Sequence, residues 1–440
     1  MSEPYARHAT PDIADGDDFS ADDHQLRPRS TRTVRFWALP ILVTLTVLSA
    51  LAAFYLGGIL QPMTNLRHFP VAILNEDAGP TGAQVVKGML AGFDNDAYDV
   101  RVLEHNEAKT QLDRAQIYGV AVIPPNFSSK LHAYAKSALT PGRVERAVII
   151  VSTNPRAGTL GANIAGQTLQ RAVAMIDQRV GQRLSQEVAE QTGKAPEPGA
   201  VALMLANPVE VKSTVHNALP DGTGNGLSAF YYALLLVLAG FTGSIVVSRR
   251  VDSMLATQAT SRLRALSIKW SMIAVLAPLT SAAYLLIAGK FGMPVQNSLS
   301  LWLFGAFAIL SVGVASTSLI AALGAFGVVL SMFLFVILGI PSAGATVPLQ
   351  ATPAWFEWLA RFEPMHQVFV GTRSLLYLSG SAGSGLSQSL VWIAGGLVAG
   401  ALLGAVVTRV YDRRGDHRIA GSAVGEPPST PAAEVVYPAQ

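Results

Sequence analysis

Few residues in this sequence have the types and the spacing that catalysis requires. The eight histidines are scattered along the chain, and each is interpreted as a surface or interface residue and not as a metal ligand. Glu76 and Asp77 are adjacent carboxylates, but neighbouring side chains project in different directions, so a turn is favoured over an acid–base pair. The chain has no cysteine, which excludes disulfides, thiolate catalysis and cysteine-based metal sites. We therefore predict no catalytic, metal-binding or cofactor-binding residue.

Sequence signatures of known enzymes are missing as well. The chain contains no Gly-x-x-x-x-Gly-Lys-Ser/Thr phosphate loop, no Gly-x-Ser-x-Gly elbow and no His-Glu-x-x-His helix. It is therefore not expected to be an enzyme, and any ATP hydrolysis must be carried out by a partner. The net charge of +3 is small, and no aromatic–basic groove pattern accompanies it, so nucleic acid is not an expected partner.

The composition indicates a lipid environment. Half of the residues are hydrophobic and 14% are charged, whereas soluble domains carry about 25% charged residues. An apolar stretch follows a basic run and extends from residue 36 to residue 60. About 25 helical residues at about 1.5 Å each are enough to cross a hydrocarbon core of about 30 Å. A cleaved signal peptide is the alternative, and the apolar continuation to Ile59 favours a retained span.

Further apolar runs appear in the second half of the chain. Predicted spans cover about 227–247, 268–288, 299–321, 324–341 and 391–410. The stretch 299–340 has no charged side chain, and its roughly 42 residues would form a helix about 63 Å long, which is twice a bilayer core. It must therefore contain two spans, and Gly324 and Gly327 mark the turn between them.

The predicted fold is an α-helical polytopic membrane protein with six spans and an inserted extracytoplasmic α/β domain. Short apolar strands alternate with helical patterns between the first two spans, which is typical of an α/β domain with a mixed or parallel sheet. The predicted parts are a disordered tail (1–33), a first transmembrane helix (34–61), the α/β domain (62–226), a five-span domain (227–411) and a second disordered tail (412–440).

Positive charges orient these spans. Basic residues flank the first span on its N-terminal side, fill the connection 248–269 and follow the last span, whereas the other connections carry few. Because cytoplasmic segments carry the excess of Lys and Arg, six spans with both termini in the cytoplasm fit the sequence. The spans contain no ionisable residue away from their ends, which argues against an ion-coupled carrier and moves the energy source to a partner.

Two features of the spans allow a functional interpretation beside a structural one. The basic residues of the connection 248–269 serve either as topology charges or as a short helix that docks on a motor subunit. These candidate partner-coupling residues are Arg249, Arg250, Arg262 and Arg264. A small-residue stripe on the last span, Gly396, Gly400 and Gly404, favours close helix packing within the bundle or a contact in a dimer. The aromatic-rich connection 341–390 predicts an interfacial or re-entrant helix pair.

Three motifs resemble known families. The segments Pro70-Val-Ala-Ile-Leu-Asn-Glu-Asp-Ala-Gly79 and Tyr118-Gly-Val-Ala-Val-Ile-Pro-Pro-Asn-Phe-Ser128 are similar to the signatures of the YhgE/Pip family. Ile340-Pro-Ser342, followed by Phe362-Glu-Pro364 and Gly371-Thr-Arg373, resembles the end of ABC-2 type membrane domains. The motif positions are Asn75, Glu76, Asp77, Gly79, Pro124, Phe127, Pro341, Ser342, Pro364 and Arg373.

This resemblance implies an exporter permease in the cell (plasma) membrane. The expected partners are the lipid bilayer, a separate ABC ATPase subunit and a second permease chain in a homodimer or heterodimer. No cofactor is expected, and the expected substrate is lipid-like or amphipathic. The alternative is a non-transporting envelope scaffold, receptor or secretion accessory protein that acts through its ectodomain. Charge reversal at the coupling arginines separates the two, because only the exporter depends on them.

Overall fold

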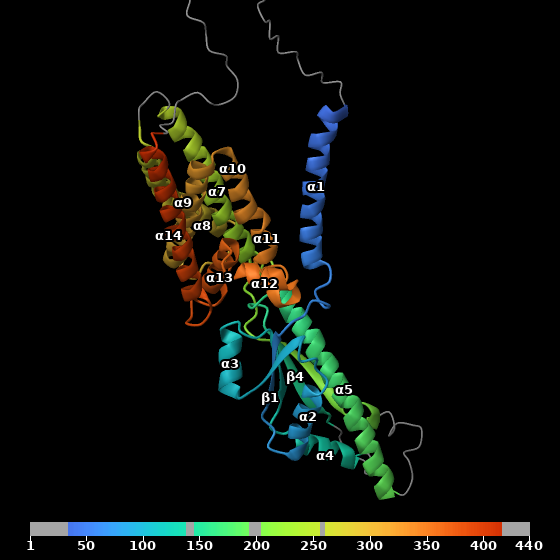
Figure 1. The fold of residues 1–440 in the computed structure, drawn as a ribbon. Coiled ribbons are helices and arrows are strands. Elements are labelled where there is room, and N and C mark those ends of the chain that lie inside the picture. The colour runs from blue at the N-terminus through green and yellow to red at the C-terminus, as the bar shows by residue number, and fades with distance from the viewer. Residues whose placement is uncertain (1–33, 138–144, 193–203, 256–259, 416–440) are drawn as a thin grey trace, which may run out of the picture. The chain divides into compact units, whose positions relative to one another are not determined.

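The computed structural model describes residues 34–137, 145–192, 204–255 and 260–415 (Figure 1). The chain divides into two compact units, residues 1–52 and 53–440, and each is described by itself. Helix α1 (Val34–Ile59) begins in the first unit and covers the range of the first predicted span. Its side chains Ile41, Leu42 and Leu45 are about 60% exposed, as apolar residues of a lipid-facing helix would be. The tail predicted over 1–33 lies outside the described residues.

Five strands form one mixed sheet. They are β1 (Phe69–Asn75), β2 (Tyr98–Leu103), β3 (Gly119–Ile123), β4 (Ala147–Thr153) and β5 (Val209–Val215), in the order β2-β1-β3-β4-β5. Strand β1 is parallel to β2 and β3, β4 is antiparallel to β3, and β5 is parallel to β4. The mixed sheet is one of the two arrangements that the sequence predicts, but β5 is not expected from it.

Helices cover both faces of the sheet. Helices α2 (Pro80–Leu90), α4 (Phe127–Ser137) and α5 (Thr159–Thr192) pack on one face, and α3 (His105–Asp113) packs on the other. Side chains of a strand point alternately to the two faces. Accordingly, Val71 and Ile73 enter the core under α2, α4 and α5, while Ala72 and Leu74 enter the core under α3.

Beyond α1, five helical segments of the described residues are long and apolar enough to cross a membrane. They are α7 (Ser228–Met254), α8 (Arg262–Lys290), α9 (Ser298–Leu323), the segment Ala325–Ser342 and α14 (Leu386–Arg413). Helix α9 is the central one and packs against α7, α8 and α14. Helix α14 extends into the range predicted as a tail, and residues 416–440 lie outside the described residues.

The turn between the third and fourth of these segments lies where the glycines predict it. Helix α9 ends at Gly324, whose φ of +61° belongs to the left-handed region that glycine tolerates. Helix α10 (Ala325–Met332) follows at once and continues through a π-helical turn (Phe333–Ile337) into α11 (Gly339–Ser342). The predicted span 324–341 is therefore helical along its length but changes its hydrogen-bond pattern in the middle.

The aromatic-rich connection forms two short helices with different environments. Helix α12 (Ala354–Ala360) exposes Trp355 and Trp358, as expected of an interfacial helix. Helix α13 (Pro364–Tyr377) is buried among the long helices and packs on α7 and α14. The apolar side chains of α13 are therefore part of the bundle core.

Candidate functional site

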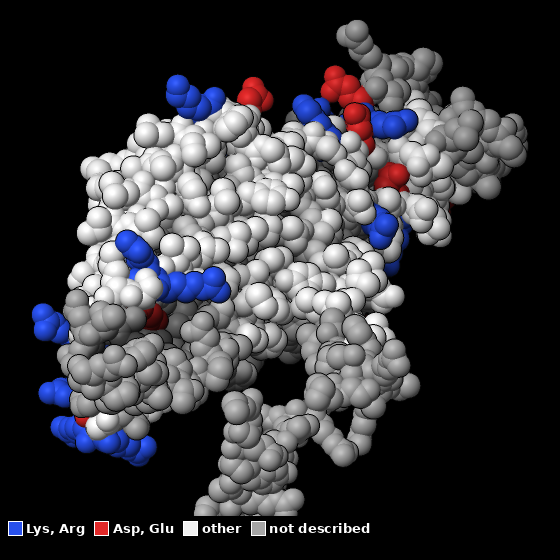
Figure 2. All heavy atoms as spheres, turned by 90° about the horizontal axis from the view of Figure 1, so that it is seen from above, with Lys and Arg blue, Asp and Glu red and all other residues white. Residues whose placement is uncertain are grey.

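The predicted coupling arginines lie on the ends of two long helices. Arg249 and Arg250 belong to the end of α7, and Arg262 and Arg264 belong to the first turn of α8. Residues 255–261 separate the two helices, and residues 256–259 are outside the described part, so the docking helix suggested from the sequence stays a prediction. We call this end of the bundle, which also carries Arg409, Arg413 and Arg414, the arginine end. Seen from above, Lys and Arg side chains project at several places around the edge of a mostly uncharged surface (Figure 2).

The exposure of the four arginines divides them into two kinds. Arg249, Arg250 and Arg264 are exposed, whereas Arg262 is half-buried and its guanidinium lies 4.7 Å from the centre of the Tyr411 ring. A cation over an aromatic face is held by the electrostatic attraction of the ring. Arg262 therefore packs within the bundle, whereas the side chains of the other three arginines are exposed.

Polar contacts join the helix ends beneath these arginines. The Asp412 carboxylate of α14 accepts hydrogen bonds from the backbone N–H groups of Arg262 (2.6 Å) and Leu263 (3.1 Å). These are N–H groups that the first turn of α8 leaves without a helical partner, and a carboxylate is favoured there by the helix dipole. The Tyr411 hydroxyl donates to the carbonyl oxygen of Ala322 in α9 (3.0 Å). The end of α14 is thereby fastened to both α8 and α9.

A buried ion pair adds α7 to this network. Lys269 of α8 is 1% exposed, and its Nζ lies 2.9 Å from Oδ1 of Asp252 in α7. Sequence reasoning placed both residues in a connection and missed the pair. The available signal was Asp252, the single acid in an otherwise basic segment, because an opposite charge among several cations can form an ion pair with one of them. At the arginine end, these hydrogen bonds and this ion pair thus join α7, α8, α9 and α14 to one another.

A second set of contacts joins the helical bundle to the α/β region, and we call it the junction. Nη1 of Arg373, in α13, donates to the carbonyl oxygen of Ala157 (2.7 Å), just before α5. In the other direction, Nη1 of Arg156 donates to the carbonyl oxygen of Tyr377 at the end of α13 (3.0 Å). Each side therefore sends one arginine to a backbone carbonyl of the other side. The motif residue Arg373 therefore links α13 to the segment before α5.

The segment before α12 strengthens the junction. The backbone N–H of Arg67 donates to the carbonyl oxygen of Gln350 (2.8 Å), and the Tyr118 hydroxyl donates to the Gln350 side chain (3.4 Å). Val347 and Ala351 are buried in the same core as β1 and α5. The connection between α11 and α14 therefore belongs to the core of the α/β region at one point and to the core of the bundle at α13.

Two ionisable side chains at the start of α13, Glu363 and His366, are mainly uncharged near neutral pH. Glu363 caps α13 by accepting from the backbone N–H of His366 (2.8 Å), and Pro364 takes the first helical position, where its missing N–H is not needed. Burial raises the pKa of Glu363 to about 8 and lowers the pKa of His366 to about 4. Both groups are therefore mainly uncharged near pH 7. Pro341 and Ser342 lie in α11, and the Ser342 hydroxyl donates to the carbonyl oxygen of Leu338 (2.7 Å).

The first two sequence motifs meet at the edge of the sheet. Strands β1 and β3 are parallel neighbours, so the loops that follow them lie side by side. Asp77 is buried in the first loop and accepts from the backbone N–H of Gly82 (3.2 Å), from the backbone N–H of Ser128 (3.1 Å) and from the Ser128 hydroxyl. Asn75 supports the loop by accepting from the Asp77 N–H (3.2 Å). Asp77 is thus a latch between two loops.

The remaining motif residues support the same interpretation. Gly79 precedes α2 and lies so close to Ser128 that a methyl group would approach its hydroxyl oxygen to 2.4 Å. The carbonyl oxygen of Pro124 accepts from the N–H of Phe127 (3.0 Å), whose ring is fully buried. Glu76 contacts the exposed His105 (2.7 Å) and does not face Asp77's partners. The geometry is that of a turn, not of an acid–base pair.

Replacing Asp77 by alanine is expected to open the latch. The change leaves the buried N–H of Ser128 without its acceptor, so we expect a loss of about 2–3 kcal/mol in local stability. Hydrogen–deuterium exchange of α4 peptides in the full-length protein measures this opening. Glu76→Ala is the matched control, because its partner His105 is exposed and a surface pair contributes at most about 1 kcal/mol. Equal exchange in both variants would contradict the latch.

The glycine stripe on α14 faces α9. A methyl group on Gly400 would lie 2.7 Å from the Ala315 Cα, and one on Gly404 would lie 2.5 Å from the Ser318 hydroxyl. Gly396 has more space, with the Ser311 hydroxyl at 3.7 Å. Gly400 and Gly404 therefore allow two helices of the same chain to approach closely.

Within the described residues, no group of three or more His, Cys, Asp or Glu side chains is placed to hold a metal ion.

Comparison with known families adds to this geometry. The family model described as ABC-2 family transporter protein matches residues 36–406, which extend from α1 into α14 and include the junction and the arginines of α7 and α8. No curated protein is significantly similar to this chain in sequence.

Proposed function

Because this chain belongs to the ABC-2 family of transporter proteins, we propose that it is the permease subunit of an exporter. Members of this family are multi-pass membrane components that are not themselves enzymes, and membership implies an ABC ATPase as a partner. The family match over residues 36–406 is the observation that carries the proposal. Its substrate, topology and dimerisation are further parts of the same proposal.

The proposed topology has six spans, with α1 as the first. Both termini and the arginine end lie in the cytoplasm, and the α/β region (62–226) lies outside the cell membrane. Support comes from the five long apolar helices and from the basic residues at one end of the bundle. The closer resemblance to the YhgE/Pip family, carried by the latch motifs, is also part of the proposal.

The ATPase is proposed to dock on Arg249, Arg250 and Arg264. These side chains are exposed on the ends of α7 and α8, and the contacts of Asp412 and of Lys269 with Asp252 brace both helices. A movement imposed on one helix end is therefore transmitted to the others, since braced helices move as packed bodies. The middle of the proposed spans contains no Asp, Glu, Lys, Arg or His side chain, so the ATPase is proposed to supply the energy for moving the substrate.

A lipid-like or amphipathic substrate fits an apolar cavity in the bundle. The cavity has a volume of about 350 Å³ and lies between α9, α13 and α14. Phe362, Val368, Trp392, Ile393 and Ala399 are among the residues that line it. Because two of its walls are membrane-spanning helices, its natural occupant is an apolar chain from the bilayer.

Purification in a mild detergent tests the proposal. We expect a nucleotide-binding subunit to be recovered with the full-length protein, and a deletion strain to lose export of a lipid-like compound. Unchanged export in the deletion strain, together with no nucleotide-binding partner, would reject the exporter. The alternative, an envelope scaffold or receptor, predicts function that depends on the α/β region and not on the arginine end.

A further inference from the structure

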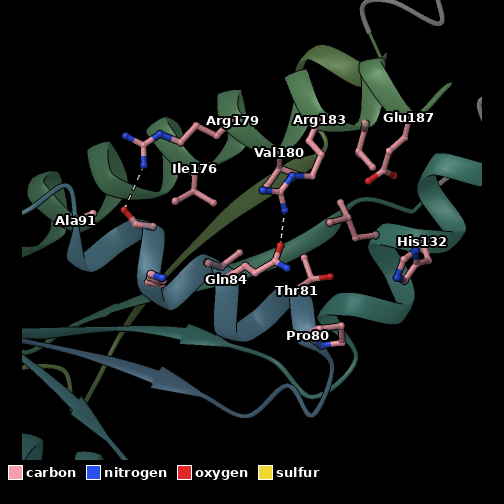
Figure 3. A pocket seen from close by; sticks show the side chains of 15 residues that line it. Pro80, Thr81, Gln84, Ala91, His132, Ile176, Arg179, Val180, Arg183 and Glu187 are labelled. Atoms are coloured by element: carbon pink, nitrogen blue, oxygen red, sulfur yellow. Dashed lines mark hydrogen bonds between the residues drawn. The ribbon is translucent and has the colours of Figure 1, made fainter. Parts of the chain in front are cut away.

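The α/β region contains a cavity that the proposed transport pathway does not use. It has a volume of about 550 Å³ and lies between α2, α4 and α5, on the face of the sheet that these helices cover (Figure 3). Its floor consists of the apolar side chains Val85, Leu131, Ile176, Val180 and Leu184. A volume of this size is typical of small-molecule sites, which range from about 300 to 1,000 Å³.

Cations surround the opening of this cavity. Lys87 comes from α2, and Arg179 and Arg183 come from one face of α5, four residues apart. All three are exposed, while Glu187 is the single acidic residue of the lining. In the described part of the chain, no ion pair includes Lys87, Arg179 or Arg183. The cavity therefore has an apolar floor and an opening with excess positive charge.

Each of the two arginines on α5 donates a hydrogen bond to α2, on the other side of the cavity. Nη1 of Arg183 donates to the Gln84 side-chain oxygen, and Nη1 of Arg179 lies 3.4 Å from the carbonyl oxygen of Gly88, to which it donates. Figure 3 shows both side chains reaching from α5 toward α2, with the cavity between the helices. One contact fixes each guanidinium and leaves its other N–H donors for a ligand, since arginine has five. The planar donor geometry of a guanidinium group suits carboxylate and phosphate groups.

We propose that this cavity binds an amphipathic anion, with its apolar chain on the floor and its carboxylate or phosphate group between Arg179 and Arg183. A purely polar anion would leave the apolar floor in water, and a neutral chain would leave the cations without a partner. An anion with an apolar chain satisfies both. The proposal names a ligand class for the exported or regulating molecule, so its biological meaning rests on the exporter function, although the binding itself does not.

Binding is tested with the full-length protein in nanodiscs of phosphatidylcholine, a lipid without net charge. The probes are dodecanoate and dodecyl phosphate, which share the chain and differ in the anionic group, and the comparison compounds are inorganic phosphate and dodecanol. Hydrogen–deuterium exchange of peptides covering α2 and residues 176–187 localises the ligand. We expect saturable protection by at least one chain-bearing anion, and at least tenfold weaker effects of phosphate and dodecanol.

Three variants complete the experiment. Arg179→Gln with Arg183→Gln should weaken binding of the chain-bearing anion at least tenfold, whereas Arg171→Gln, an exposed arginine of the same helix that does not line the cavity, should not. Val180→Phe, which fills part of the cavity, should weaken binding with both arginines present. Unchanged binding in the double variant, or protection confined to segments other than α2, α4 and α5, would overturn the site. Since no ATPase or transport enters this assay, its failure leaves the exporter proposal standing.

Discussion

Replacing Arg373 by methionine is expected to loosen the junction without weakening the bundle. Arg373 is half-buried with its Nε enclosed, and no ion pair in the described part of the chain includes it. Its Nη1 donates to the carbonyl oxygen of Ala157, and its guanidinium lies 5.6 Å from the centre of the Phe369 ring. Burial also lowers the pKa of Arg373, which shows that its environment disfavours the charge. Methionine removes this desolvation penalty while filling a similar volume, so the bundle should be as stable or more stable.

The junction should respond in the opposite direction. Without Arg373, the carbonyl oxygen of Ala157 loses a charge-assisted hydrogen bond, which contributes about 1.5–3 kcal/mol. We therefore expect hydrogen exchange of the segment 154–162 to accelerate about tenfold or more, together with a loss of export, while thermal unfolding of the bundle is not lowered. Arg373→Lys should not restore the junction, because lysine lacks the planar donor geometry.

Controls separate the junction from general destabilisation. Arg156→Met removes the reciprocal bond to Tyr377, so the double variant with Arg373→Met should show a coupling energy in a double-mutant cycle. Arg361→Met changes an exposed arginine in the turn between α12 and α13 and should leave exchange at 154–162 unchanged. If Arg373→Met lowers the unfolding temperature without faster exchange at this segment, Arg373 supports the bundle core and not the junction.

The sequence predicts those parts of the fold whose signal is local. Apolar runs that are long enough to cross a bilayer core as a helix indicate the long helices. Gly324 marks the turn between α9 and α10, because this turn needs a residue with positive φ. Strand β5 escapes such reasoning, since Val209–Val215 includes charged and polar residues and most of its side chains are not buried. A strand of this kind is held by its hydrogen bonds to β4 and not by its own pattern.

The candidate sites depend on residues that are far apart in the chain. Arg373 and Ala157 are 216 residues apart, and Asp412 lies 150 residues from Arg262. No spacing rule covers such pairs, because they arise only when the packed helices bring them together. The motif resemblance identified Asp77 and Arg373 as positions of interest, and the structure supplies their partners. Conversely, Arg262 looked equivalent to its neighbours in sequence, and its half-buried position and its contact with Tyr411 distinguish it.

Charge reversal of Arg249, Arg250 and Arg264 to glutamate is expected to abolish recovery of the ATPase. The three side chains are exposed on braced helix ends, so the substitutions remove attraction to a partner without opening the core. An interface that loses three cations and gains three anions suffers both lost pairing and like-charge repulsion. We expect at least tenfold less nucleotide-binding subunit in pull-downs of the full-length protein, and a matching loss of export.

Reversal of Arg409, Arg413 and Arg414 is the matched control, because these exposed arginines lie at the end of α14 and change the net charge by the same amount. If the basic residues act only through membrane topology, both triple variants should disturb insertion equally, as protease accessibility of the α/β region would show. If α7 and α8 form the docking surface, only the first variant should lose the ATPase. An envelope scaffold would keep its function in both, which makes the ranking of the two variants decisive.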